Sequence, residues 1–318
     1  MINLEVFNGY KHLITKNKSS RLDYIRPISL DGDNEVYFEE IKKFIGTDED
    51  LSLIETIDGF EFMAVIKKLI WDSNFFGIET AKILGIYTIS EMEPTTDVYL
   101  KLLQNINSYL ADQNVEYILW QIDARDINLI QAACEKGYVL IESRLHYYIN
   151  LLSFNSSERY DVRLATDNDI DTLSKAAVEM ANMYDRFHAD SFLPREKVDQ
   201  LMAKWVEASI SGNFADGAIV PNVEKPKAFC TFKLHKENWA SWGKNISQPV
   251  FSAVSGEFRG WYRKIISELN YFMKDEGAEF AFLITQSTNK AVIHSWESLG
   301  YKFGKNEFVF RKILRRPS

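Results

Sequence analysis

The stretch FAFLITQSTNKAVIHSWESLGY (Phe280–Tyr301) decides the fold, because it contains a strand, a helix and a turn in close succession. Its first seven residues form an apolar run typical of a buried strand, and Asn289–Leu299 has the spacing of a helix that ends at a glycine. An earlier stretch, YILWQIDARDINLIQAACEKGY (Tyr117–Tyr138), has the same order and aligns with it without a gap. Strand and helix alternate in both stretches, which predicts an α/β protein.

The similarity extends to the segments on either side of these stretches. A helical pattern precedes each one, over Val98–Leu110 and over Tyr262–Met273. A strand-forming segment follows each one, at Val139–Ile149 and at Glu307–Phe310. A strand–helix–strand–helix–strand unit used twice indicates a duplicated α/β (mixed α+β) domain. The alternative is a chance likeness between two βαβ units, since few residues are identical.

A polar linker separates the two copies. Phe154–Glu158 is rich in turn-forming residues, and the pattern restarts at Arg163 with Thr166 and Asp169 spaced as in a capping box. We therefore expect an N-terminal extension over 1–60, a first domain over 61–157 and a second over 158–318.

Composition excludes several classes of protein. Hydrophobic residues make up 46% and charged residues 26% of the chain, which excludes a largely disordered protein. The two cysteines, Cys134 and Cys230, are too few for a disulfide scaffold or a four-cysteine zinc site. The five histidines show no HxxH or HExxH spacing, so we expect no metal. The net charge of −8 disfavours nucleic-acid binding. The N-terminus has no signal pattern and no apolar run is long enough for a membrane span, so we expect a cytoplasmic protein.

The residues that lead into the first helix of each copy differ in charge. Anionic ligands bind where such a helix begins, because free amide groups and the helix dipole point there. The first copy has Ser90–Asp97 at this place, with three acidic residues, no basic residue and no glycine. The second copy has Val254–Lys264, with two glycines and three basic residues. We expect a phosphate site in the second copy only, the alternative being an ordinary solvated start of a helix.

These residues resemble the GNAT superfamily of acyl-CoA N-acyltransferases. The family signature is a strand, then Arg/Gln-x-x-Gly-x-Gly/Ala at the start of a helix, then a second strand and an asparagine-containing turn. Arg259-Gly260 and the segment Thr285–Tyr301 resemble these parts. Three further segments are similar to two-domain members that acetylate a nucleotide-linked amino sugar, and the resemblance covers about residues 65–312. Those segments are WDSNFFG (Trp71–Gly77), DRFHAD (Asp185–Asp190) and Trp205–Gly217.

The resemblance implies two tandem GNAT-like domains, of which the first is degenerate and the second holds the acyl-CoA site. It implies an acetyl-CoA-dependent N-acetyltransferase that acts on the amine of an amino sugar, nucleotide-linked, in surface-polysaccharide synthesis. The alternatives are a catalytically impaired member that binds CoA or a sugar nucleotide without turnover, and an acyltransferase of the aminoacyl-tRNA-dependent type. The oligomeric state stays open, a homodimer included.

The resemblance also assigns residues to roles. The end of the strand before the loop holds the thioester carbonyl, the loop and the helix start bind the pyrophosphate of CoA, and the asparagine contacts the pantetheine arm. The cofactor-binding residues are then Ala253, Val254, Arg259, Gly260, Trp261, Tyr262, Arg263, Lys264 and Asn289. Tyr184, Arg186 and Phe187 are assigned to the acceptor substrate. His188 and Asp185 are the candidates for catalysis, because histidine titrates near neutral pH; the alternative is a hydrogen-bonded structural turn.

Two positions depart from the family pattern. The phosphate loop aligns only with a two-residue deletion, which places the bulky Trp261 and Tyr262 where a backbone cradle is usual. The family's general-acid tyrosine lies seven residues after the asparagine, and Trp296 stands there. Because an indole has no useful proton to give, the leaving thiolate needs another source, with His294, Tyr301 and water as alternatives.

Overall fold

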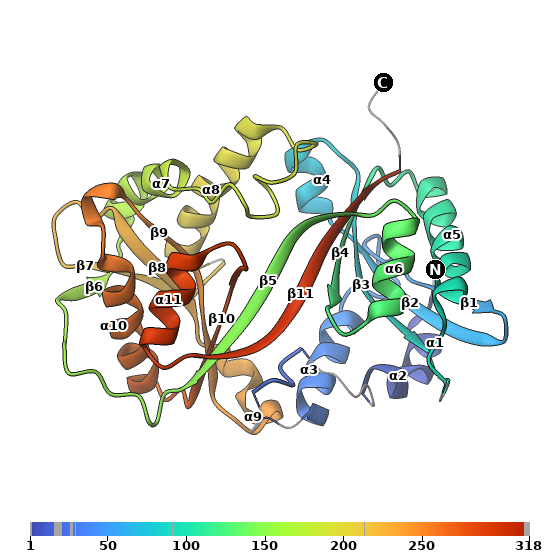
Figure 1. The fold of residues 1–318 in the computed structure, drawn as a ribbon, viewed down its shortest axis with the longest axis horizontal. Helices are drawn as coiled ribbons and strands as arrows, with labels where there is room; N and C mark the ends of the chain where they lie inside the picture. The colour runs from blue at the N-terminus through green and yellow to red at the C-terminus, as the bar shows by residue number, and fades with distance from the viewer. Residues whose placement is uncertain are drawn as a thin grey trace. The chain divides into compact units, whose positions relative to one another are not determined.

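The computed structural model describes residues 2–15, 21–25, 28, 30–88, 90, 92–212 and 214–314. Glu91 and Asn213, which belong to segments singled out in the sequence, lie outside these residues. The chain divides into two compact units, Met1–Ser143 with Asn306–Ser318, and Arg144–Lys305 (Figure 1). The stretch interpreted as an extension therefore belongs to the first unit. The sequence-based boundary at residues 157 and 158 stays a prediction.

The sheet of the second unit has the order β5-β10-β9-β8-β7-β6, in which β9 and β10 run parallel and the other neighbours run antiparallel. Its strands are β5 (Val139–Asn150), β6 (Val162–Leu164), β7 (Gly217–Pro221), β8 (Ala228–Lys233), β9 (Ile246–Val254) and β10 (Phe280–Gln286). Its helices are α7 (Ile170–Glu179), α8 (Arg195–Ile210), α9 (Trp239–Trp242), α10 (Trp261–Asp275) and α11 (Lys290–Ser298), with short 3₁₀ turns η1 (Asp167–Asp169), η2 (Lys236–Asn238) and η3 (Gly256–Phe258).

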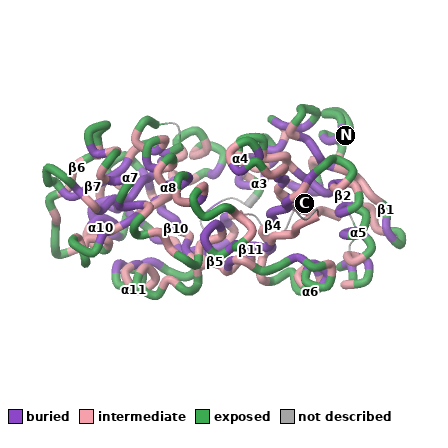
Figure 2. Tube along the Cα trace, turned by 90° about the horizontal axis from the view of Figure 1, so that it is seen from above, coloured by how far each residue is buried: buried purple, intermediate pink, exposed green. Residues whose placement is uncertain are grey.

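Helices cover both faces of this sheet. Cys230 and Phe232 of β8 belong to the buried cluster that α10 and α11 close. Phe229, on the other side of the same strand, contacts Phe251 of β9, whose ring lies 5.8 Å from that of Trp205 on α8. Because neighbouring side chains of a strand point to opposite faces, α8 lies opposite α10 and α11. Buried residues gather inside each unit in Figure 2.

The strands β9 and β10 separate early. They pair only at Ile246 with Phe280 and at Ser247 with Ala281, although β9 runs on to Val254 and β10 to Gln286. On its other side β9 stays paired with β8 as far as Val254, with an irregularity opposite Cys230–Phe232. The sheet therefore opens as a wedge toward the carboxyl ends of both strands. We call it the β9/β10 wedge.

The first unit repeats this architecture. Its sheet has the order β1-β2-β3-β4-β11, with β3 and β4 parallel. Its strands are β1 (Leu53–Ile57), β2 (Phe60–Lys68), β3 (Thr80–Thr88), β4 (Tyr117–Asp123) and β11 (Lys302–Ile313). Its helices are α1 (Leu4–Gly9), α2 (Lys11–Thr15), α3 (Leu30–Lys42), α4 (Ile70–Phe76), α5 (Thr96–Asp112) and α6 (Ile127–Glu135).

One pair of hydrogen bonds shows how closely the two units correspond. The hydroxyl of Tyr138, just after α6, donates to the side chain of Asn107 on α5 at 2.7 Å. The hydroxyl of Tyr301, just after α11, donates to the side chain of Asn270 on α10 at 2.5 Å. All four side chains are buried. The duplicated α/β architecture predicted from the sequence is confirmed, and so is the capping box of Thr166 and Asp169.

The closing strands are exchanged between the two copies. The strand that follows the first repeat, β5, pairs with β10 from Arg144 to Asn150, in the second unit. The last strand of the chain, β11, pairs with β4 from Glu307 to Ile313, in the first unit. Sequence order predicts the reverse. The two strands have similar apolar patterns, so either could close either sheet, and only the fold decides between them.

Among the described residues, no helix is both long and apolar enough to cross a bilayer.

Candidate functional site

The carboxyl ends of β9 and β10 carry the residues assigned to the cofactor. Ala253 and Val254 end β9 and pair with β8, on the side away from the wedge. Asn289 precedes α11, and its side-chain amide donates to the hydroxyl of Thr285 on β10 at 3.3 Å. Ligands of α/β sheets bind at this edge of parallel strands, because loops and helix N-termini converge there. The fold therefore brings these three predicted residues to one edge of the second unit.

The loop between β9 and α10 begins and ends with groups suited to an anion. The hydroxyl of Ser255 is buried and has no hydrogen-bond partner among the described residues. Gly260 has φ = 91° and precedes the first residue of α10, whose first-turn amides lack partners within the helix. The side chain of Arg259, next to it, is exposed. An orphaned buried hydroxyl, a helix N-terminus and an arginine fit the pyrophosphate of an acyl-CoA.

The other two basic residues of this loop already have neighbours. The guanidinium of Arg263 donates to the hydroxyl of Ser298 on α11 at 3.0 Å. The ammonium of Lys264 lies over the rings of Trp261 and Tyr160, at 5.0 and 5.2 Å from their centres. These contacts hold α10 against its surroundings, so Arg259 is the basic side chain best placed to meet a ligand.

Tyr262 on α10 is half-buried and contacts the buried Trp296 on α11. The indole N–H of Trp296 donates to the hydroxyl of Tyr262 at 2.8 Å. Burial raises the pKa of Tyr262 far above its usual value, and the side chain of Ser252 on β9 hydrogen-bonds to the same hydroxyl. Because an indole can only donate, the tyrosine keeps its own proton available. The sequence assigned Tyr262 to cofactor binding and did not connect it with Trp296.

Tyr301, an alternative proton source in the sequence, is committed elsewhere. Its hydroxyl donates to Asn270, and burial raises its pKa well above the usual value. His294 lies exposed on α11. Tyr262 is therefore the phenol whose hydroxyl accepts the indole N–H of Trp296.

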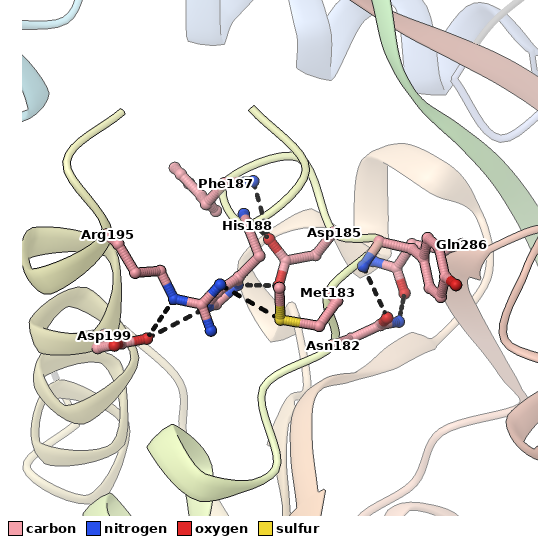
Figure 3. A network of polar contacts seen from close by, with 9 residues as sticks. Asn182, Met183, Asp185, Phe187, His188, Arg195, Asp199 and Gln286 are labelled. Atoms are coloured by element: carbon pink, nitrogen blue, oxygen red, sulfur yellow. Dashed lines mark hydrogen bonds and ion pairs between the residues drawn. The ribbon is translucent and has the colours of Figure 1, made fainter. Parts of the chain in front are cut away.

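The residues that the sequence assigned to the acceptor and to catalysis lie on the loop between α7 and α8 (Figure 3). One carboxylate oxygen of Asp185 accepts from the backbone amides of Phe187 and His188 at 2.8 and 3.0 Å, and the other lies 2.6 Å from His188 Nδ1. His188 Nε2 lies 3.3 Å from a carboxylate oxygen of Asp199 on α8. Arg195 donates to the same oxygen of Asp199 at 3.2 Å. We call His188, Asp185 and Asp199 the histidine clamp.

Both ring nitrogens of His188 face carboxylates. A neutral imidazole has one N–H, so donating to both requires the imidazolium. Burial lowers the pKa of His188, but the hydrogen bond and charge of Asp185, with the bond to Asp199, outweigh it and raise the pKa above the usual value. An imidazolium has no lone pair to take a proton from an amine. This geometry favours a role in holding the loop over the base suggested by the sequence.

The three residues assigned to the acceptor differ in how far they are exposed and in what they contact. Tyr184 is 62% exposed, whereas Phe187 is buried, with its ring 5.4 Å from that of Trp205. The guanidinium of Arg186 lies 4.2 Å from the centre of the Phe187 ring. Phe187 therefore anchors the loop in the core, and Tyr184 is the side chain that can meet a ligand.

A further contact ties this loop to the wedge. The side-chain amide of Asn182 donates to the side chain of Gln286, the last residue of β10, at 2.8 Å. The sequence indicated neither this contact nor Asp199. Only the spacing of Arg195 and Asp199, four residues apart on one helix, carried a signal for part of the network. The acceptor-side residues and the cofactor-side residues thus lie at the same end of β10.

The described residues contain no group of three or more potential metal ligands that could hold an ion.

No family model and no curated protein matches the sequence. The structure is similar to a GCN5-related N-acetyltransferase from Sphaerobacter thermophilus, with a TM-score of 0.64 and 11% identity over 98% of this chain and 94% of that one. It is also similar to a tandem GNAT protein from the clavulanic acid biosynthesis pathway, with a TM-score of 0.56 and 9% identity over 100% and 98% of the chains.

The chain has a tandem GNAT fold. A third similar structure is a GCN5-related glucosamine N-acetyltransferase region of a fungal multi-domain GH3 beta-N-acetylglucosaminidase. Its TM-score is 0.60 and its identity 10%, over 96% of this chain and 37% of that one. The fold class expected from the sequence, two tandem GNAT-like domains, is confirmed. The β9/β10 wedge lies in the second of these two GNAT-like units.

Proposed function

We propose that this protein is an acetyl-CoA-dependent N-acetyltransferase whose active site lies in the second GNAT unit. The observation that carries the proposal is the β9/β10 wedge, with the loop of Ser255 and Arg259 at its wide end. An extended thioester arm can pair with the free edge of β9, as a peptide strand would. Its pyrophosphate then meets Arg259 and the first turn of α10.

The reaction requires an attacking amine, hydrogen-bond donors for an oxyanion and a source of a proton at one place. The amine nitrogen attacks the thioester carbonyl carbon and gives up one proton, while the carbonyl oxygen becomes an oxyanion. The carbonyl then re-forms as the carbon–sulfur bond breaks, and the leaving thiolate takes up a proton. We assign the oxyanion to backbone amides near Ala253 and Val254, and the pyrophosphate to Arg259 and Gly260. Asn289 stays a proposed contact of the pantetheine arm.

The acceptor we propose is the amine of an amino sugar. The segments WDSNFFG and DRFHAD resemble TDP-fucosamine acetyltransferase, which suggests a nucleotide-linked sugar and a place in surface-polysaccharide synthesis. The similar fungal region is itself described as a glucosamine N-acetyltransferase. On this proposal Tyr184, Arg186 and Phe187 form the acceptor side, of which Tyr184 is the most exposed.

Two measurements test the proposal. Calorimetric titration with acetyl-CoA should give micromolar binding at about one site per chain, as one open wedge predicts. Thiol release is then followed with a panel of amino sugars, free and nucleotide-linked, with matched N-acetylated sugars as the control. The proposal fails if acetyl-CoA does not bind up to millimolar concentration. Binding without thiol release on any amine favours the second candidate.

That second candidate is a protein that binds CoA or a sugar nucleotide without turnover. The pair of Tyr262 and Trp296 favours it, because two large side chains occupy the space where α10 approaches α11. Tyr262→Phe and Tyr262→Gly separate the two candidates. If the phenol supplies the thiolate's proton, Tyr262→Phe lowers kcat and leaves the affinity for acetyl-CoA unchanged. If the two rings hinder the arm without excluding it, Tyr262→Gly raises the affinity for acetyl-CoA and Tyr262→Phe leaves it unchanged, with no thiol release from either variant.

A further inference from the structure

The loop between α7 and α8, which we call the acceptor-side loop, is attached to neighbouring elements at both ends. At one end Asn182 bonds to Gln286, where β10 ends. At the other end His188 bonds to Asp199 of α8. Arg195 of α8 adds a contact to the sulfur of Met183 at 3.2 Å (Figure 3). The exposed Tyr184 lies between these attachments, and the backbone amide of Tyr184 also donates to the side chain of Asn182 at 3.0 Å.

The contact with α8 depends on charge. The His188 side chain is wholly buried, and both its nitrogens lie against carboxylate oxygens. Only the imidazolium can donate to both at once. When the ring loses one proton, one of its nitrogens carries a lone pair that faces a carboxylate. The lone pair and the carboxylate then repel each other. The charged groups that act on the ring are Asp185 from its own loop, and Asp199 and Arg195 from α8.

We propose that the histidine clamp positions the acceptor-side loop at the mouth of the β9/β10 wedge, so that His188, Asp185 and Asp199 act as positioning residues for the acceptor. The inference rests on the proposed function, because it takes the substrate of this loop to be the acceptor amine. Asp199 and Gln286 gain a role that the sequence did not indicate. The clamp joins the loop to α8 and includes none of the residues assigned to acetyl-CoA, so it should affect acceptor binding and leave acetyl-CoA binding unchanged.

The clamp makes acceptor recognition depend on pH in a stated direction. The pKa of His188 is raised, so the imidazolium holds the loop below that pKa. As the pH rises through the pKa of His188, the ring loses one of its two hydrogen bonds to the carboxylates, and the KM for the acceptor increases. The acceptor amine titrates as well, but identically for wild type and variants. The ratio of their KM values at each pH therefore reports the clamp.

The first test needs no substrate. Nitrogen-15 NMR of histidine-labelled full-length protein shows whether both His188 nitrogens carry protons at pH 7, and His188→Gln identifies the signals. Two protonated nitrogens and a pKa above the usual range are expected. A neutral ring at pH 7 with an ordinary pKa would overturn the clamp, whatever the enzymatic activity.

The second test is kinetic. Asp199→Asn keeps the size and removes the charge, and should raise the KM for the acceptor roughly tenfold, with kcat and acetyl-CoA affinity little changed. Asp199→Glu should partly restore it. Glu207→Gln, an exposed carboxylate on the same helix, is the matched control. An unchanged acceptor KM in Asp199→Asn would overturn the positioning role. Absence of wild-type activity would refute the proposed function and leave the NMR result standing.

Discussion

The two GNAT units share a core and differ at the open edge of the sheet. In the first unit β3 and β4 pair from Thr80 to Ile83, and the ring of Tyr87 lies so close over Gly85 that any side chain there would collide with it. In the second unit the parallel pairing stops after Ser247 and Ala281. The parallel strands of the first unit therefore pair over four residues, and those of the second over two.

A second difference is in the groups that occupy this edge. In the first unit the hydroxyl of Tyr37, from α3, donates to the backbone carbonyl of Leu84 on β3 at 3.0 Å. Glu93 precedes α5 and Asp97 lies in its first turn, whereas the loop before α10 carries Arg259. The duplicated core, with its Asn–Tyr hydrogen bond, is therefore compatible with sheet edges of opposite charge. The proposed acyl-CoA site therefore depends on the edge and not on the shared core.

The largest effect is expected from reversing the charge at that edge. Arg259→Glu should weaken acetyl-CoA binding at least about a hundredfold, because it places a carboxylate beside the pyrophosphate. Lys101→Glu, an exposed charge reversal on the corresponding helix α5, is the matched control: it breaks the ion pair with Asp58 and should leave acetyl-CoA binding unchanged. Calorimetry measures both. Equal losses in the two variants would contradict the assignment of binding to the second unit.

The shared core predicts equal effects in the two units. Tyr301→Phe and Tyr138→Phe each leave a buried asparagine oxygen without its donor, and each should cost about 1–3 kcal/mol of unfolding free energy. Urea unfolding measures both. A cost confined to one unit would mean that the two hydrogen bonds are not equivalent.

A smaller effect is expected in the phosphate loop. Gly260→Ala should cost about 1–2 kcal/mol, because Gly260 has φ = 91° and a side chain there is strained although nothing crowds it. Gly256→Ala is the matched control, since Gly256 has open space and no positive φ. Unfolding free energies and acetyl-CoA affinities are compared for the two variants. Similar losses in both would show that the positive φ of Gly260 is not the cause of the cost.

The smallest effect is a dependence of stability on pH. Because the pKa of His188 is raised in the folded state, its stabilising contribution is complete below the unfolded-state pKa and is lost as the pH rises through the folded-state pKa. Thermal unfolding from pH 6 to 9 should show this loss in wild type and less of it in Asp199→Asn. An identical profile in the variant would place the pH dependence elsewhere.

The repeat can be recognised in the sequence because its signals are local. Gly137 and Gly300 end their helices with φ of 78° and 91°, and the apolar periodicity of strand and helix is visible without any contact. The charge difference between the two helix starts was equally local. The histidine clamp was only half visible, since Asp185 lies three residues from His188 whereas Asp199 comes from another helix.

By itself the sequence determined the duplicated α/β architecture, the tandem GNAT resemblance and the basic loop of the second unit, because hydrophobic spacing, glycines and charge act over a few residues. Only the tertiary structure decided which closing strand joins which sheet, since β5 and β11 offer similar strands and the choice depends on contacts far apart in the chain. It also decided that Tyr262 meets Trp296, that His188 is held between two carboxylates, and that Asn182 reaches Gln286. Each of these needs two elements to meet, which no local pattern encodes.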